Sequence, residues 1–184
     1  MSPSSQVRVL KTSKIVGAVV GLLAVGWSAN GLAAQDKYTL KVPDGLALSE
    51  FRGYETWAPV AVSQTEESLK VISANPEMIK AYQSGLPAAG KKFPDGSKVV
   101  KLEWARKDSK GAPYAVMVPG ELKSVAVILK DTKRFPKTNG WAYAIFKVDA
   151  AGVLKPDGKG AECGYACHTK VAANDYIFTA YPKR

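Results

Sequence analysis

The sequence has few of the residues that most metal centres and disulfide frameworks need. Its 184 residues include one histidine, His168, and only two cysteines. A single imidazole excludes a histidine-rich metal centre and any mechanism that uses two imidazoles, and two cysteines are too few for a disulfide-built scaffold. The sequence also lacks a glycine period, low-complexity tracts and internal repeats, which argues against collagen-like, disordered and solenoid chains. With 46% hydrophobic and 23% charged residues, the composition indicates a globular protein with one main domain.

The first 34 residues contain no acidic residue and have the three parts of a secretory signal peptide. Three basic residues come first, at Arg8, Lys11 and Lys14. An apolar run over residues 15–27 follows, and then small residues lead up to Ala34. The alternative, an uncleaved membrane anchor, needs about 20 apolar residues, and this run is shorter. We therefore expect residues 1–34 to be a signal peptide cleaved after Ala33 or Ala34, and residues 35–184 to form one periplasmic domain without stable membrane insertion.

The chain that remains after cleavage is basic, with 23 Lys and Arg against 16 Asp and Glu. Its lysines are scattered along the sequence instead of forming a patch, and export removes the usual nucleic-acid partner, so nucleic acid is not expected. The positive balance fits either a solvated surface or the steering of an acidic redox partner or an anionic substrate.

Secondary-structure signals predict an α+β fold, mainly an antiparallel β-sheet with a few helices. A helix is expected to begin at Asn75, which can cap free amides, with Pro76 in its first position, and to end at Gly85. Five strands are expected where β-branched and aromatic residues are bounded by Gly, Pro or Asn, at residues 98–104, 114–118, 124–130, 141–148 and 176–181. The short spacings between the middle strands favour antiparallel pairing.

The chemistry of the sequence is concentrated in Cys163, Cys167 and His168, because the histidine directly follows the second cysteine. Covalent haem attachment uses such an arrangement: two thioethers bond the porphyrin vinyl groups, and the adjacent imidazole reaches the iron from one face. The usual box has two residues between the cysteines and this one has three, an insertion that looping out Gly164 or Tyr165 would absorb. We expect covalently attached haem c, held by one thioether or two, with His168 as the iron ligand.

Three other interpretations of the cysteines remain open. In an oxidising compartment they could form a disulfide across one helical turn. A structural zinc site would need more ligands than the chain holds. A redox-active thiol pair would normally have two intervening residues at a helix start in a βαβ unit.

The distal face of the iron can hold Met, Lys, water or nothing, because the one imidazole is used on the proximal face. Met78 and Met117 both lie in apolar surroundings that suggest core packing. We therefore expect an open face, which binds small molecules, whereas six-coordinate haem mostly transfers electrons. Glu103 and Glu121 are the candidate acid or base for proton transfer, and both also suit a solvated surface.

Several segments together resemble the cytochrome P-460 family. They are residues 93–101, Asn139-Gly140-Trp141, the cysteine–histidine box and Asp175-Tyr176-Ile177-Phe178-Thr179. The resemblance runs from about Phe51 to Tyr181 and implies a mainly β fold with haem attached near the C-terminus, in exported bacterial proteins. It also implies one of two activities. Founding members oxidise hydroxylamine and carry a bond from a lysine side chain to the haem edge, whereas relatives similar to cytochrome c′-beta lack this bond and bind nitric oxide.

The resemblance places the cross-linking lysine in the strand after Gly96, where side chains alternate between the two faces. Lys98 and Lys101 fall on opposite faces, so only one of them can face a haem pocket. Either is the candidate, and the absence of a cross-link is the third outcome.

The expected function is oxidation of hydroxylamine or a related small nitrogen species at an open iron face. A nitric oxide or other gas-binding cytochrome and an electron carrier are the alternatives. Expected partners are the small substrate or gas and a redox partner protein, and a homodimer is left open as the assembly.

Overall fold

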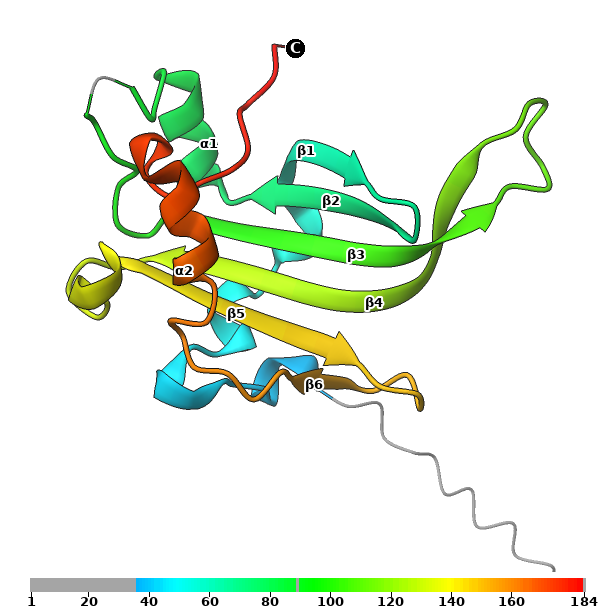
Figure 1. Cartoon of the computed structure of the whole chain (residues 1–184), viewed down its shortest axis with the longest axis horizontal. Coiled ribbons are helices and arrows are strands. Elements are labelled where there is room, and N and C mark those ends of the chain that lie inside the picture. Colours follow the sequence, from blue (N-terminus) through cyan, green and yellow to red (C-terminus); the bar gives the residue numbers. More distant parts are fainter. Residues whose placement is uncertain (1–35, 89, 184) are drawn as a thin grey trace, which may run out of the picture. The chain divides into compact units, whose positions relative to one another are not determined.

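A six-stranded antiparallel sheet, with its strands in sequence order, organises the structure (Figure 1). The structure is a computed structural model that describes residues 36–88 and 90–183, so the expected signal peptide lies outside the described residues. The strands are β1 (Ala58–Gln64), β2 (Ser68–Ala74), β3 (Lys98–Asp108), β4 (Met117–Lys130), β5 (Trp141–Val148) and β6 (Leu154–Pro156). The predicted α+β class with a mainly antiparallel sheet is confirmed.

The helices are short, and the predicted helix after Asn75 is confirmed as α1 (Pro76–Gln83). The Asn75 side chain accepts a hydrogen bond from the Met78 amide at 3.2 Å, which satisfies one of the free amides at the helix start. The other helix, α2 (Tyr165–His168), carries part of the cysteine–histidine box. Short 3₁₀ turns make up the remainder: η1 (Lys37–Thr39), η2 (Pro43–Gly45), η3 (Leu48–Phe51), η4 (Tyr54–Thr56), η5 (Pro136–Thr138) and η6 (Thr169–Asn174). No described helix is long and apolar enough to cross a membrane.

Two strand predictions need correction in the middle of the chain. The separate strands expected at 114–118 and 124–130 are one strand, β4, and residues 114–116 belong to the hairpin that precedes it. Gly120 lies between the two predicted strands and inside β4. A Cβ there would come within 3.1 Å of the Ala105 carbonyl oxygen, so glycine permits close approach of the two strands.

The strand expected at 176–181 is wrong. Asp175 and Tyr176 adopt left-handed backbone conformations, with φ of 47° and 64°, which turn the chain away from strand geometry. The Tyr176 carbonyl then meets a histidine side chain instead of a neighbouring strand. Strands β1, β2 and β6 were not predicted.

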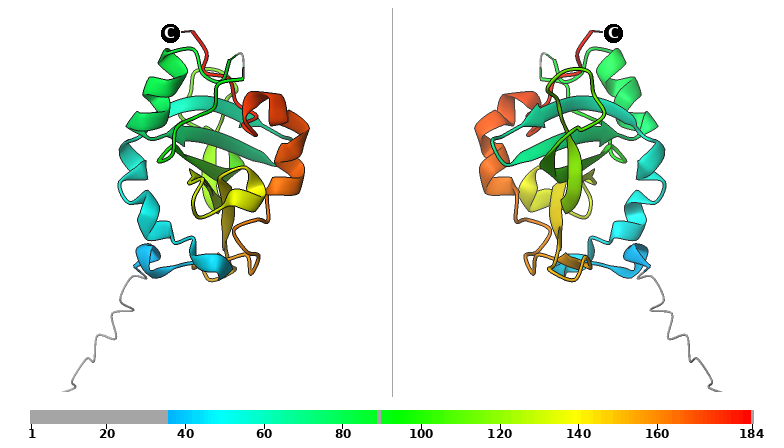
Figure 2. Two further views of the ribbon diagram at one scale, coloured as in Figure 1. Left: turned by 90° about the vertical axis from the view of Figure 1, so that its left-hand side faces the viewer. Right: turned by 90° about the vertical axis from the view of Figure 1, so that its right-hand side faces the viewer.

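Alternation along the strands buries both faces of the sheet. One cluster contains Phe51, Val100 and Phe146, and the other contains Val99 and Tyr143. The N-terminal turns cover the first face and α2 lies over the second, as the two side views show (Figure 2). Burying a large apolar side chain contributes about 1.5–3 kcal/mol, so both faces contribute to stability. The cysteine–histidine box therefore belongs to the second face.

Candidate functional site

A cavity of about 820 Å³ lies on the second face of the sheet. Its floor is made by residues of β1 to β5, and its wall by α2 and the C-terminal segment. The polar and reactive side chains that line it include Lys70, Lys101, Tyr143, Cys163, Cys167 and His168. Val62 and Phe178, which are 75% and 55% exposed, also line it. Large apolar side chains exposed in a concave site are typical of pockets that hold a large apolar ligand.

The cysteine–histidine box approaches the sheet closely because its second residue is glycine. A Cβ on Gly164 would lie 2.7 Å from the Tyr143 ring, which no ordinary contact allows. Cys163 lies in the turn before α2, whereas Cys167 and His168 lie within the helix. The extra residue of the box is thus taken up before the helix, and the geometry of the Cys167-His168 pair is that of a regular helical turn.

The His168 imidazole is oriented by the backbone. Its Nδ1 lies 2.5 Å from the Tyr176 carbonyl oxygen, so the proton belongs on Nδ1 and the Nε2 lone pair is free. The rings of Tyr143 and Phe178 pack against the imidazole at centroid distances of 4.5 and 4.9 Å. Burial lowers the pKa of His168 and the charge of Lys101 acts in the same direction, against the hydrogen bond, which raises it. The neutral imidazole that metal binding requires is therefore favoured.

The two cysteines are free thiols on the cavity wall, and their surroundings differ. Cys163 is half-buried, and its Sγ donates to the Tyr143 carbonyl oxygen at 3.6 Å. Burial raises the pKa of the Cys163 thiol. Cys167 is exposed. The thiol next to the histidine is therefore the more accessible of the two.

The structure separates the two candidate lysines. Lys101 lines the cavity and is close enough for its charge to lower the pKa of His168. Lys98 lies on the opposite face, where its Nζ donates to the Glu50 carbonyl oxygen at 2.6 Å and lies 5.9 Å from the centroid of the Phe51 ring. Of the two candidates, Lys101 is therefore the one placed to meet a group bound in the cavity.

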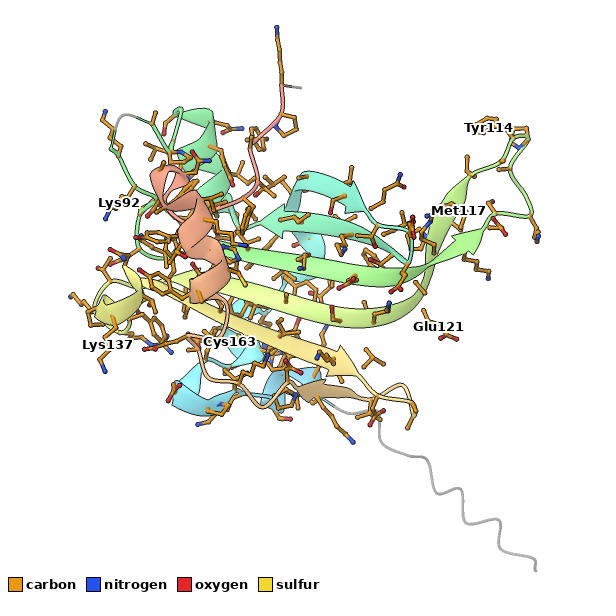
Figure 3. The ribbon with its side chains drawn as sticks, viewed as in Figure 1. Lys92, Tyr114, Met117, Glu121, Lys137 and Cys163 are labelled. Atoms are coloured by element: carbon orange, nitrogen blue, oxygen red, sulfur yellow. The ribbon has the colours of Figure 1, made fainter. Side chains whose placement is uncertain are left out.

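The candidate carboxylates lie outside the cavity wall. Glu103 is on the same face as Lys101 and is joined to the cavity through Lys70, whose Nζ lies 3.6 Å from its carboxylate. Glu121 lies farther along, beside the bend of β4 and away from Cys163 (Figure 3). Among the described residues that line the cavity there is no carboxylate, and its charged side chains are lysines.

Glu103 gives a pH-dependent stability test. Burial alone would raise the pKa of Glu103, but hydrogen bonds from Ser68 and Ser124 and nearby lysine charges outweigh it and lower the pKa. A carboxylate with a lowered folded-state pKa stabilises the protein above its unfolded pKa, about 4.3, and loses that contribution as the pH falls. Glu103→Gln should lower the free energy of unfolding by about 2 kcal/mol at pH 7.

In urea unfolding, this difference between wild type and variant should shrink as the pH falls below the unfolded pKa, and it should disappear once the pH is below the lowered folded-state pKa of Glu103. Glu121→Gln is the control, because Glu121 is exposed and has no hydrogen bond or ion pair within the described residues. A difference for Glu103→Gln that stayed constant from pH 7 to pH 3 would contradict the ionised, hydrogen-bonded state.

Neither methionine lines the cavity. Met78 is fully buried against the second core cluster, and Met117 lies on the projecting hairpin, at the other end of the sheet from Cys163 (Figure 3). A haem group fits the residues that are present, because the cavity combines two thiols, an imidazole with a free Nε2 and an apolar floor. Tyr143 belongs to the floor, and its hydroxyl is buried and has no hydrogen-bond partner among the described residues.

Sequence reasoning missed the residues that support the histidine. Tyr143 and Tyr176 both contact the His168 ring or its nitrogen, and Lys70 reaches the cavity from an unpredicted strand. Tyr143 could have been found from alternation, since it shares a face of β5 with Trp141. The contact made by the Tyr176 carbonyl depends on a left-handed turn, for which the sequence carries no clear signal.

Comparison with known proteins identifies one family. A comparison with curated proteins finds no match. The model of the family described as Cytochrome P460 matches residues 51–179. This match covers most of the chain, including strands β1 to β6 and the cysteine–histidine box. The chain therefore belongs to the cytochrome P460 family, a family of haem proteins.

Proposed function

We propose that the protein is an exported c-type cytochrome that oxidises hydroxylamine or a related small nitrogen species at an open haem face. Haem would be held by thioethers from Cys163 and Cys167 and by the Nε2 atom of His168. When bound, it would supply the redox centre and the iron face at which a small molecule binds. The observation that carries the proposal is the position of Lys101, which shares the cavity with the imidazole.

The remaining residues of the cavity support binding and charge balance. Lys70 and Lys159 line the cavity along with Lys101, and such cations suit the carboxylates at the edge of a haem group. Glu103 would act on the site through Lys70, since its carboxylate contacts that side chain and not the cavity itself. The cavity is also lined by apolar residues of β3 to β5, among them Val99, Ile128 and Ile145.

The direct test is turnover by the purified, haem-loaded protein. Hydroxylamine with an artificial electron acceptor should give acceptor reduction that depends on the holoprotein, and the resting ferric spectrum should be that of an open iron. The lack of a lining carboxylate within the described residues favours one alternative, a nitric oxide-binding cytochrome. A nitric oxide adduct without hydroxylamine turnover would support that alternative, and a low-spin resting state that resists nitric oxide would support an electron carrier.

Covalent attachment can be tested on the two thiols separately. Each thioether forms when a thiol S–H adds across a vinyl double bond, so attachment adds the full haem mass without an oxidant. Wild type, expressed with cytochrome c maturation machinery, should show this mass in intact-protein mass spectrometry. Because the Cys167 thiol is exposed and the Cys163 thiol is half-buried and hydrogen-bonded, Cys163→Ser should retain more bound haem than Cys167→Ser.

Two outcomes would contradict these expectations about haem attachment. An intact wild-type mass equal to that of the bare mature polypeptide would exclude covalent attachment. Equal retention in the two variants would contradict the unequal access of the thiols, while still allowing two thioethers.

A further inference from the structure

A fully buried ion pair between Lys130 and Asp175 holds the segment that follows the cysteine–histidine box, and the pair itself has no part in the proposed reaction. The side chains of Lys130 and Asp175 are 2% and 1% exposed, and Lys130 Nζ lies 3.0 and 3.2 Å from the two carboxylate oxygens. Each partner has a further hydrogen bond: the Phe93 amide donates to Asp175 at 2.9 Å, and Lys130 donates to the Asn139 carbonyl oxygen at 3.0 Å. A buried charge pair needs such additional hydrogen bonds to offset the loss of water.

The ion pair ties the C-terminal segment to the end of the sheet. Lys130 is the last residue of β4 and pairs with Trp141 on β5, whose ring lies 4.7 Å from the Lys130 Nζ. Asp175 belongs to the segment that follows the cysteine–histidine box. The position of Asp175 relative to the cavity floor is therefore fixed by a charged contact inside the protein.

The ion pair also fixes the position of Tyr176, the residue that follows Asp175. Asp175 and Tyr176 are consecutive left-handed residues that are not glycine, a conformation that persists only where surrounding contacts enforce it. This turn directs the Tyr176 carbonyl oxygen to Nδ1 of His168 at 2.5 Å. Two residues farther on, the Phe178 ring packs edge-on against the same imidazole. The chain thus runs from a buried ion pair, through a strained turn, to the histidine.

We propose that Lys130 and Asp175 are positioning residues for the iron ligand, and that they lower the reduction potential of the bound haem through the Tyr176 carbonyl. The inference rests on ligation of haem by His168, which belongs to the proposed function. A hydrogen bond from Nδ1–H to a carbonyl oxygen orients the ring and makes Nε2 a stronger donor. A stronger axial donor stabilises the ferric state and strengthens the iron–histidine bond.

The test compares the reduction potential and the iron–histidine stretching band of the ferrous holoprotein in wild type and Lys130→Met. A change in the reduction potential could come from the lost charge or from lost positioning, and these two causes predict opposite signs. Removal of a positive charge by itself lowers the potential and leaves the band in place. Loss of positioning raises the potential and shifts the band to lower frequency. Lys133→Met, which removes an exposed lysine after β4, should change neither quantity.

A second variant covers the case in which Lys130→Met does not fold because Asp175 is left without its partner. Lys130→Met combined with Asp175→Asn leaves the net charge unchanged and removes the ion pair without leaving a buried charge unpaired. A raised potential with a lower-frequency band supports the proposal, and unchanged values overturn it. Hydroxylamine turnover enters neither readout. A wild-type protein without an iron–histidine band would overturn ligation by His168 and this proposal with it, whereas a band that does not move in the variants overturns only the positioning role.

Discussion

Replacing His168 with alanine is expected to abolish the native haem spectrum while the polypeptide keeps its fold. No second imidazole exists in the sequence, and neither Met78 nor Met117 lines the cavity, so no nearby side chain of those types can take over the iron. The fold does not depend on this ring, because neither buried core cluster includes His168. Loss of its hydrogen bond to the Tyr176 carbonyl should cost only about 1 kcal/mol.

The measurement pairs absorption spectra of the ferric and ferrous protein with far-ultraviolet circular dichroism. Lys170→Ala is the control, because Lys170 is exposed on η6, two residues after the histidine. It should keep both the spectrum and the fold. A native spectrum in His168→Ala would show that another group binds the iron, and a lost fold would show that the ring is part of the core.

The elements that were predicted correctly have strong local signals. Asn75 and Pro76 mark a helix start by capping and backbone restriction, and β5 is bounded by Gly140 and the turn after Val148. The strand expected after Asp175 failed because its aromatic, β-branched composition also suits a segment that packs side chains into a cavity. An apolar composition predicts that a segment is buried. Whether the segment forms a strand also depends on whether a free sheet edge lies beside it.

The candidate site was predictable where chemistry and spacing coincide. Cys163, Cys167 and His168 are close in sequence, and the structure brings all three to one cavity wall. The residues that support them were beyond local reasoning. Lys130 and Asp175 are 45 positions apart and meet only because β4 ends beside the turn that follows η6. Long-range pairs of this kind depend on topology, which one sequence does not encode in any short window.

Lys101→Ala is expected to abolish hydroxylamine turnover and to restore an ordinary c-type spectrum. Alternation along β3 puts Lys98 and Lys101 on opposite faces, and only Lys101 lines the cavity with His168. The amine of Lys98 is already engaged by the Glu50 carbonyl oxygen on the other side of the sheet. A bond from a lysine side chain to the haem edge can therefore form at Lys101 without disturbing the sheet, whereas at Lys98 it would require the strand to turn over.

Lys98→Ala is the matched control, since it removes the same side chain three residues away on the same strand. It should keep the cross-linked spectrum and turnover and lower the free energy of unfolding by about 1 kcal/mol through the lost hydrogen bond. Peptide mapping of the wild-type holoprotein should recover a haem peptide that contains Lys101 together with the cysteine–histidine box. A haem joined only to the box peptide would refute the cross-link. The described residues that line the cavity include no carboxylate to accept a proton, so an unmodified haem there would bind small gases, and that result would favour the nitric oxide-binding alternative.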